Sequence, residues 1–352
     1  MNSPEGLVLA GDIGGTKTLL GLYSDCGDRL EIVMEASFAN KDYSSIDAVI
    51  DSFLSRLDKI GSGLIRSATL GVAGPVHGDR GTLTNLSWTI DAGELGAKFS
   101  IRDISVINDL VATAWSVDAI ADEDLFVLKP GTVQKGNAAV IAAGTGLGEA
   151  ILFWDGRGFI PSASEGGHAD FAPTTPIQSD LLDYLAELHG HVSYERVLSG
   201  KGLASVYSFL KSRRDSVEPA YLAKRFENED AAAVVSSEAI NGHDKNCSDA
   251  LDIFISVYGA EAGNLALKGF AVGGIYIAGG IAPKILPAME RGGFTEGFIK
   301  KGRFERLMNS IPVYVIMNRK AALRGAAIHA CRPLTDGPQR KAIRSIVGRT
   351  EP

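Results

Sequence analysis

The chain twice places a glycine- and threonine-rich loop between two apolar runs. In residues 7–22, Leu7–Ala10 and Leu19–Leu22 read as buried strands on either side of the loop 11–18. In residues 138–153 the same arrangement surrounds the loop 144–148. The shared part is too short to establish a sequence repeat. It suggests two halves, each of which offers a hairpin loop to one phosphate chain.

The first loop has the composition of a phosphate site. Its glycines let the backbone present bare N–H groups at close range, while Thr16 and Thr18 add hydroxyl donors and Lys17 adds charge. Asp12 places a carboxylate beside the loop, which makes sense if Mg²⁺, held through water, lies between the like charges. An ordinary tight hairpin is the alternative, because Gly-Gly is common between strands.

Two familiar phosphate motifs do not match this loop. A Walker A loop needs glycine before its lysine, whereas Thr16 precedes Lys17 here. A dinucleotide-binding fingerprint leads into a helix, whereas this loop leads into a second apolar strand. Whether the loop is a phosphate site or an ordinary hairpin therefore depends on the rest of the chain.

Bulk composition restricts the class of protein. The 352 residues are 45% hydrophobic and 22% charged, typical of a globular protein with two lobes of ordinary size. The net charge of −7 argues against a nucleic-acid surface. Cys26, Cys247 and Cys331 are too few and too far apart for a disulfide framework or a C-x-x-C zinc site. With no signal-peptide pattern and no run of about 20 apolar residues, we expect a cytoplasmic protein without a membrane partner.

Periodicity gives a coarse order of elements. It predicts a buried strand that runs into a tight turn within 68–76, and further strands over 82–86 and 105–107. It also predicts helices over 46–57 and from 321 to about 330, and mostly helical segments over 178–213 and 229–270. We expect a small α/β domain of residues 1–110 with about 321–352, and a large α/β domain of residues 111–320. The tail 334–352 has little periodicity, and we expect it to be loosely docked.

Polar residues follow the strand 105–107 directly. Asn108 and Asp109 stand where that strand ends and a helical pattern begins, the usual place for ligand chemistry in an open α/β sheet. A carboxylate at the amino end of a helix is favoured in its ionised form. A second polar cluster contains Glu165, His168 and, further on, Glu195. Together these planar hydrogen-bonding groups match a polyol with neighbouring hydroxyls.

Each of these side chains also has a plainer interpretation. Glu165, Asp170 and Glu195 taken singly read as solvated surface residues, and a lone His168 as a structural histidine. His189 and His191 lack a third convincing metal ligand and read as surface residues. A strand, a double-glycine turn at Gly279-Gly280 and a helix from about Pro283 form a further site, where backbone without Cβ atoms suits a nucleotide base and ribose.

Taken in order, the motifs resemble those of the bacterial glucokinases, in the superfamily of actin, hexokinase and the heat-shock ATPases. The matching segments cover about residues 7–333: 11–16, 71–75, 83–85, 107–109, 144–148, 164–173, 195–199 and 277–281. The resemblance implies a two-lobed α/β fold of the actin-like, ribonuclease H-like kind. It also implies a kinase that phosphorylates D-glucose to glucose 6-phosphate with MgATP.

The resemblance also implies residue roles. Asp109 would be the catalytic base and would contact the sugar together with Asn108, Glu165, His168, Glu195, Gly74 and Asn85. The ATP-binding residues would be Gly11, Asp12, Ile13, Gly14, Gly15, Thr16, Lys17, Gly144, Thr145, Gly146, Gly279 and Gly280. Asp12 would act in the outer shell of Mg²⁺ through water, and a homodimer would be expected.

Two departures separate the chain from parts of this superfamily. Lys17 stands where many of these enzymes have asparagine. No cysteine lies near His168, which disfavours the branch with a zinc motif, so we expect no zinc. Other hexose kinases, a sugar-sensing regulator and a non-kinase ATPase remain as alternatives, and the sequence does not fix which hexose is preferred or whether polyphosphate can replace ATP.

Overall fold

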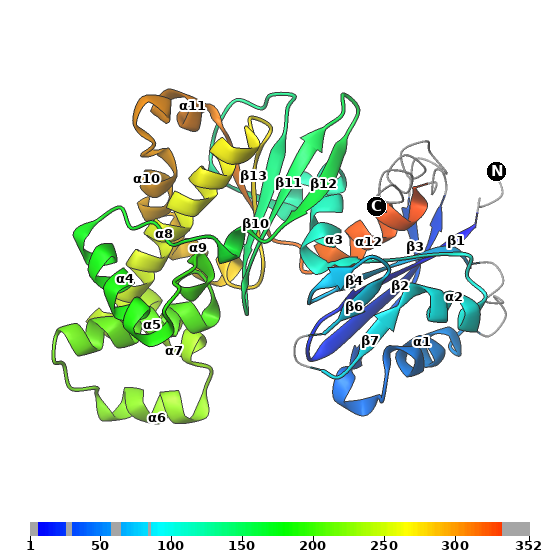
Figure 1. Cartoon of the computed structure of the whole chain (residues 1–352), viewed down its shortest axis with the longest axis horizontal. Helices are drawn as coiled ribbons and strands as arrows, with labels where there is room; N and C mark the ends of the chain where they lie inside the picture. Colours follow the sequence, from blue (N-terminus) through cyan, green and yellow to red (C-terminus); the bar gives the residue numbers. More distant parts are fainter. Residues whose placement is uncertain (1–5, 26–29, 58–64, 84–85, 333–352) are drawn as a thin grey trace, which may run out of the picture. The chain divides into compact units, whose positions relative to one another are not determined.

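The computed structural model describes residues 6–25, 30–57, 65–83 and 86–332. The described residues form two compact units (Figure 1). The first lies within residues 1–107 and 326–352, and the second comprises residues 108–325. The expected division at 110/111 and about 320/321 stays a prediction about domains, because compactness alone does not show that a unit folds independently.

The first unit is built on a sheet of five strands in the order β3-β2-β1-β4-β8. β1 pairs antiparallel with β2 and parallel with β4, so the glycine loop 14–16 joins two central strands. A separate sheet has the order β5-β6-β7. The bounds are β1 Leu7–Ile13, β2 Lys17–Asp25, β3 Leu30–Ala39, β4 Ile65–Val72, β5 Val76–His77, β6 Arg80–Thr82, β7 Thr89–Asp91 and β8 Asp103–Asn108.

Two amphipathic helices complete the core of this unit. α1 (Ile46–Leu54) begins at Ser45, whose hydroxyl accepts from the Ala48 N–H. α2 (Ala92–Phe99) begins at Asp91, whose carboxylate accepts from the Glu94 N–H. The helices bury their apolar faces in one core with strands β1, β2 and β4. That core fixes the ends of β1 and β2 and therefore the loop between them.

The second unit repeats the strand order of the first. Its sheet runs β12-β11-β10-β13-β14-β9, with β10 antiparallel to β11 and parallel to β13. β10, β11, β12, β13 and β14 thus stand in the relation of β1, β2, β3, β4 and β8. The bounds are β9 Leu125–Lys129, β10 Ala138–Ala143, β11 Leu147–Trp154, β12 Phe159–Ser164, β13 Gly274–Ala278 and β14 Val313–Ile316. The two glycine loops therefore occupy equivalent positions.

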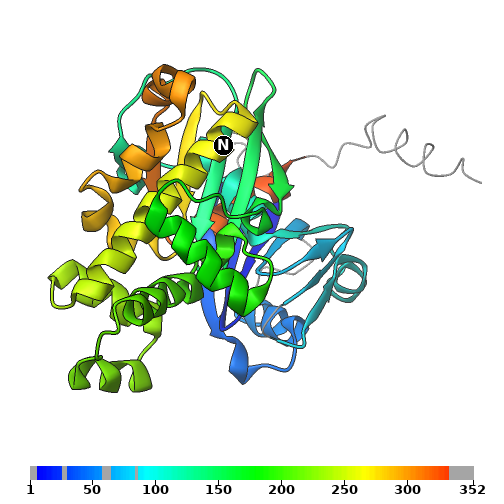
Figure 2. The same ribbon diagram turned by 60° about the vertical axis from the view of Figure 1, so that its left-hand side comes forward.

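Alternation along β10 divides this sheet into two faces. Ala139 and Ile141 pack with α8, whereas Ala138 and Val140 pack with α3 (Asp109–Trp115). Of the remaining helices, α5, α7, α9 and α10 pack against α8 (Figure 2, α8 in yellow), and α4, α6 and α11 pack against those helices in turn. Their bounds are α4 Pro176–His189, α5 Gly200–Arg213, α6 Ala220–Asn228, α7 Ala231–Asn241, α8 Lys245–Gly269, α9 Ala282–Met289, α10 Gly293–Ile299 and α11 Glu305–Ser310.

The last helix, α12 (Ala321–Cys331), ends one residue beyond the expected Ala330. In the first unit, the Ser67 hydroxyl donates to the Ala330 carbonyl (2.6 Å), and Thr69 hydrogen bonds with His329 (2.9 Å). None of the helices in the described ranges is long and apolar enough to span a bilayer.

Most expected elements are confirmed, with one correction. The strand predicted over 82–86 is wrong: β6 ends at Thr82, and Leu86 follows in a bend. The Leu83 N–H donates to the carbonyl of Trp88 (3.3 Å), which lies outside any strand, and residues 84 and 85 lie outside the described ranges. The strands β9, β12 and β14 were not predicted from the periodicity of the sequence.

Candidate active site

The first glycine loop is braced by a buried asparagine. The Gly14 N–H donates to the Lys17 carbonyl (3.0 Å) and closes the turn. Asn40 donates from Nδ2 to the Gly14 carbonyl and accepts on Oδ1 from the Thr18 hydroxyl, each at 2.8 Å. Asn40 is 1% exposed, so these bonds are shielded from water. Sequence reasoning missed this residue, since a lone asparagine after an apolar strand carries no signal.

The loop presents backbone donors to its surroundings. In the described part of the chain, no hydrogen bond occupies the N–H groups of Gly15 and Thr16, and the Thr16 and Lys17 side chains are exposed. Asp12 lies near the end of β1 and is half-buried. Gly11 lies inside β1, where a Cβ would lie 2.7 Å from Cδ2 of Leu70, so its small size serves packing between β1 and β4. Ile13 is fully buried.

The second glycine loop belongs to the other unit. The Gly144 N–H donates to the Gly146 carbonyl (2.8 Å), and the Gly144 carbonyl accepts from the Gly200 N–H (2.9 Å) at the start of α5. Just before the loop, the Ala143 N–H donates to the hydroxyl of the buried Tyr258 on α8 (3.1 Å). Thr145 is exposed at the tip. This loop is therefore held from two helices.

The double glycine lies against the same loop. Gly279 has φ of +85°, a conformation that glycine adopts readily, and a Cβ there would lie 2.5 Å from the Ala143 carbonyl oxygen. The Ile281 N–H donates to that carbonyl (3.4 Å). Gly279 and Gly280 are both exposed. Within the second unit, the two backbone sites predicted for the nucleotide are thus neighbours.

Asn108 and Asp109 occupy the junction of β8 and α3. Asn108 caps the helix by accepting the Leu110 N–H on Oδ1 (2.9 Å), and that N–H also approaches Oδ1 of Asp109 (2.9 Å). Burial raises the pKa of the Asp109 carboxyl above its usual range, although the backbone donors oppose this. The donors at the helix start favour the ionised form, as expected, but the loss of solvation outweighs them.

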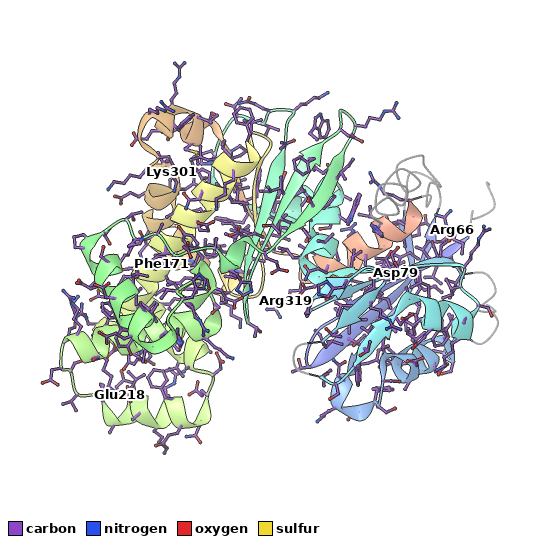
Figure 3. All side chains as sticks on the ribbon, in the orientation of Figure 1. Arg66, Asp79, Phe171, Glu218, Lys301 and Arg319 are labelled. Atoms are coloured by element: carbon purple, nitrogen blue, oxygen red, sulfur yellow. The ribbon has the colours of Figure 1, made fainter. Side chains whose placement is uncertain are left out.

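The residues predicted to bind the sugar converge on the start of β11. Oε2 of Glu195 accepts the Leu147 N–H (3.0 Å), and a Cβ on Gly167 would overlap the Leu147 carbonyl. The segment after His168 pairs with the segment before Glu195: the Phe171 N–H donates to Val192, and the Tyr194 N–H donates to Ala169. Phe171 (Figure 3) also contacts the Tyr194 ring edge to face at 5.7 Å. Glu165, His168 and Glu195 are thus brought to one place.

α3 reaches the same place from the other face of the sheet. A Cβ on Gly148 would lie 2.9 Å from Cδ2 of Leu110, so the first turn of α3 lies over the start of β11. Glu165 and His168 are exposed, and Glu195 is half-buried. In the first unit, a Cβ on Gly74 would overlap the Thr82 carbonyl, which requires glycine there. Asn85 lies outside the described residues.

The plainer interpretations hold for the outlying groups. His189 is the exposed last residue of α4. His191 pairs with Asp170 (Nε2 to Oδ1, 2.8 Å), and both side chains are mostly exposed. Among the described residues, no group of three or more His, Cys, Asp or Glu side chains is arranged to hold a metal ion.

Comparison with known proteins gives one consistent result. A family model described as Glucokinase matches residues 9–333. The glucokinase of Trichormus variabilis is 40% identical over 341 residues, covering 93% of this chain and 99% of that protein. The glucokinase of a Synechocystis species is 38% identical over 346 residues, covering 92% and 98%.

Solved structures agree with these sequence relatives. A glucokinase from an Antarctic psychrotroph superposes with a TM-score of 0.81 at 31% identity, covering 92% of this chain and 98% of that chain. The glucokinase of Balamuthia mandrillaris in complex with glucose gives 0.74 at 23% identity, covering 92% and 93%. At that identity the second comparison shows the shared fold alone.

Proposed function

Because the chain belongs to the glucokinase family and is therefore an ATP-dependent glucose kinase, we propose that Asp109 is the general base of its phosphoryl transfer. The glucose 6-hydroxyl oxygen attacks the γ-phosphorus of ATP, the bond to the β–γ bridging oxygen breaks, and ADP leaves. Asp109 accepts the hydroxyl proton as the new bond forms. The products are glucose 6-phosphate and ADP.

The environment of Asp109 carries this proposal. It stands at a strand-to-helix junction, and burial raises its pKa toward the working range of a general base. In the described part of the chain, no lysine, arginine or histidine forms an ion pair with Asp109. A carboxylate without a cationic partner keeps its capacity to accept a proton from substrate.

The sugar is held by groups that pair with neighbouring hydroxyls. Asn108, Glu165, His168 and Glu195 supply planar donors and acceptors. The N–H groups of Leu147 and Leu110 hold the Glu195 and Asn108 side chains, which favours a fixed arrangement of these two. Gly74 and Asn85 are further proposed sugar contacts. We place the ATP phosphates on the loops 11–17 and 144–146, and the adenosine beside Gly279 and Gly280. Within the described ranges, no hydrogen bond occupies the N–H groups of Gly15 and Thr16, which supports the phosphate assignment.

The residues beside the first glycine loop fit a Mg²⁺ ion that binds together with ATP. Mg²⁺ keeps several waters and takes one or two carboxylates along with substrate phosphates, so a built cage of side chains is not needed. The half-buried Asp12 beside the glycine loop meets that requirement through water. When bound, the ion would neutralise charge on the phosphate oxygens. Asp12 would orient its water shell.

Two finer properties belong to the same proposal. A cytoplasmic location fits the three widely spaced cysteines, of which Cys247 and Cys331 form no disulfide bond among the described residues. A homodimer is the proposed assembly, and sedimentation velocity of the purified chain tests it. A monomer at working concentration would contradict the dimer and leave the catalytic assignment intact.

The proposed function is tested by ADP formation from MgATP with glucose, with mannose, fructose and N-acetylated hexosamines, and without sugar. Turnover that depends strongly on glucose is expected. A clear preference for another hexose would identify a different hexose kinase. ADP release that ignores every sugar would place the chain among non-kinase ATPases, and glucose binding without turnover would indicate a sensor.

A further inference from the structure

A pair of buried carboxyl groups lies beneath the loop that carries Glu165 and His168. Glu149 of β11 is 2% exposed, and Glu261 of α8 is fully buried. Glu149 pairs in register with Ile141, on the face of the sheet that α8 covers, and its carboxyl group is within hydrogen-bonding contact of Glu261. The sequence carries a signal for Glu149, since it is a charge inside the apolar run 147–153.

The two carboxyl groups differ in their other partners. Glu261 accepts from Asn264 Nδ2 (2.8 Å) and from Lys268 Nζ (3.3 Å). In contrast, Oε1 of Glu149 is buried without a hydrogen-bond partner in the described part of the chain. Two touching carboxyl groups form a hydrogen bond only when one carries a proton. Because Glu261 already has a cationic donor, the proton belongs on Glu149.

The backbone of the sugar loop rests on this pair. A Cβ on Gly166 would overlap Oε2 of Glu149, so no other group fits between the carboxyl and the loop. Asn264 also donates to the hydroxyl of Tyr194 (3.0 Å), the residue before Glu195. Lys301 (Figure 3) donates to Asn264 Oδ1 (2.6 Å) and to the Ala260 carbonyl (2.8 Å). Both sugar-binding segments therefore rest on one buried cluster.

We propose that Glu149 is a positioning residue whose protonated side chain holds residues 165–168 in place for glucose, and whose ionisation beside Glu261 displaces that loop. This inference rests on the proposed function, because it assigns the loop to glucose. Ionisation would place two negative charges in contact in a buried site. Since the loop backbone touches the carboxyl, relief of the repulsion moves Gly166 and its neighbours.

The charged and titratable groups around Glu149 set the pH range. Burial and the charge of Glu261 raise the pKa of Glu149 to about 8, and the nearby Lys268 opposes them. Tyr258 and Tyr194 have pKa values raised by burial, so they stay neutral in this range. Burial lowers the pKa of Lys301, which contacts Asn264 but not Glu149. Glucose affinity is therefore expected to weaken above about pH 8.

The test compares glucose KM and kcat from pH 6.5 to 9.5 in the wild type, Glu149→Gln and Glu238→Gln. One pH unit above its pKa, only about a tenth of Glu149 is protonated, so the wild-type KM rises about tenfold. Glu149→Gln keeps the wild-type KM at pH 7 and loses the rise. Glu238→Gln, a matched buried glutamate paired with Arg225, follows the wild type.

The inference would be overturned if glucose KM rose equally at alkaline pH in the wild type and in Glu149→Gln. It would also be overturned if the wild-type KM did not change with pH. A protein that phosphorylates no sugar would instead refute the proposed function. Whether the Glu149 carboxyl group carries a proton in the folded protein is tested without substrate, by thermal unfolding of the wild type as a function of pH. A carboxyl whose folded pKa is raised stabilises the fold at low pH, and this contribution is lost as pH rises to about 8.

The stability of Glu149→Gln should therefore fall less with rising pH than that of the wild type, because the variant has no carboxyl group to ionise at this position. Should this variant fail to fold, Gly166→Ala decides the question, because its Cβ would displace the same contact. It is expected to raise glucose KM severalfold at pH 7 with kcat nearly unchanged. An unchanged KM in folded Gly166→Ala would overturn the proposal.

Discussion

Asp109 shows how two opposing effects are weighed at a single carboxylate. Charge at a helix start is worth about 0.3–1 kcal/mol, whereas one unit of pKa shift corresponds to about 1.4 kcal/mol and burial can shift a carboxyl by several units. Burial therefore prevails, and the pKa of Asp109 is raised. A base with a raised pKa binds the substrate proton more readily when the hydroxyl oxygen begins to attack.

The acid limb of the pH–rate profile should report this shift. The base works only when deprotonated, so kcat should fall as pH drops through the raised pKa of Asp109, at a higher pH than for an ordinary aspartate near 3.9. Steady-state kinetics from pH 4 to 8 measure the limb. Asp170→Asn, which removes an exposed acid, should leave it in place. An acid limb that coincides with an ordinary aspartate would contradict the assignment.

Single residues differ in how far the sequence identifies them. Asp109, Glu165, His168 and Glu195 stand in motifs, and their placement could be proposed before the structure was known. Asn40 could not, because its bond to the Gly14 carbonyl depends on a strand register 26 residues further along the chain. The pairing of Glu149 with Glu261 depends on how α8 crosses the sheet, and no local pattern encodes that.

At the scale of elements, the second glycine loop contains two glycines with different surroundings. A Cβ on Gly146 would lie 2.5 Å from Oε2 of Glu195, whereas a Cβ on Gly144 would meet no atom within 4 Å. Gly146 thus keeps open the space in which Glu195 accepts the Leu147 N–H. If Glu195 binds glucose as proposed, the loop contributes to the sugar site through the shape of its backbone.

Gly146→Ala should therefore weaken glucose binding even without nucleotide. We expect the glucose dissociation constant to rise about tenfold or more, corresponding to the loss of about 1.5 kcal/mol typical of a displaced hydrogen bond to a charged group. Gly144→Ala is the matched control and should bind glucose normally. Isothermal titration calorimetry measures the glucose affinity of the two variants. Equal affinities would show that the position of the Glu195 side chain does not depend on Gly146.

The elements themselves were predictable where periodicity was strong. Both strand–loop–strand hairpins and the helices α8 and α12 follow from apolar runs in the chain. β9 and β14 were not anticipated, because each is short and gains its stability from pairing with the other across a long sequence separation. β12 is mostly exposed and lacks a clear apolar alternation.

The whole molecule repeats one strand order in two units, and this repetition was only partly visible in the sequence. Two short loops suggested it, whereas the order β3-β2-β1-β4-β8 and its counterpart β12-β11-β10-β13-β14 required the structure. The actin-like fold came from the family resemblance. Pairing order is set by contacts between distant segments, which no window of sequence contains.

Glucose should stabilise the molecule as a specific ligand. At a concentration 100 times its dissociation constant, a ligand that binds only the folded state adds about 2.7 kcal/mol to the free energy of unfolding. Differential scanning calorimetry with and without glucose measures this shift. Glycerol, a small polyol at equal concentration, should give a far smaller one. If glucose and glycerol shifted the unfolding transition equally, the side chains of Glu165, His168 and Glu195 would not recognise the sugar specifically.

The most direct test of the account separates binding from chemistry in Asp109→Asn. The amide keeps the size of the side chain and much of its hydrogen bonding but cannot accept the proton. We expect the glucose dissociation constant to stay within a few-fold of the wild type, while kcat falls by about 10²–10⁴. A kcat close to that of the wild type would contradict Asp109 as the base, and loss of glucose binding would show that its role is structural.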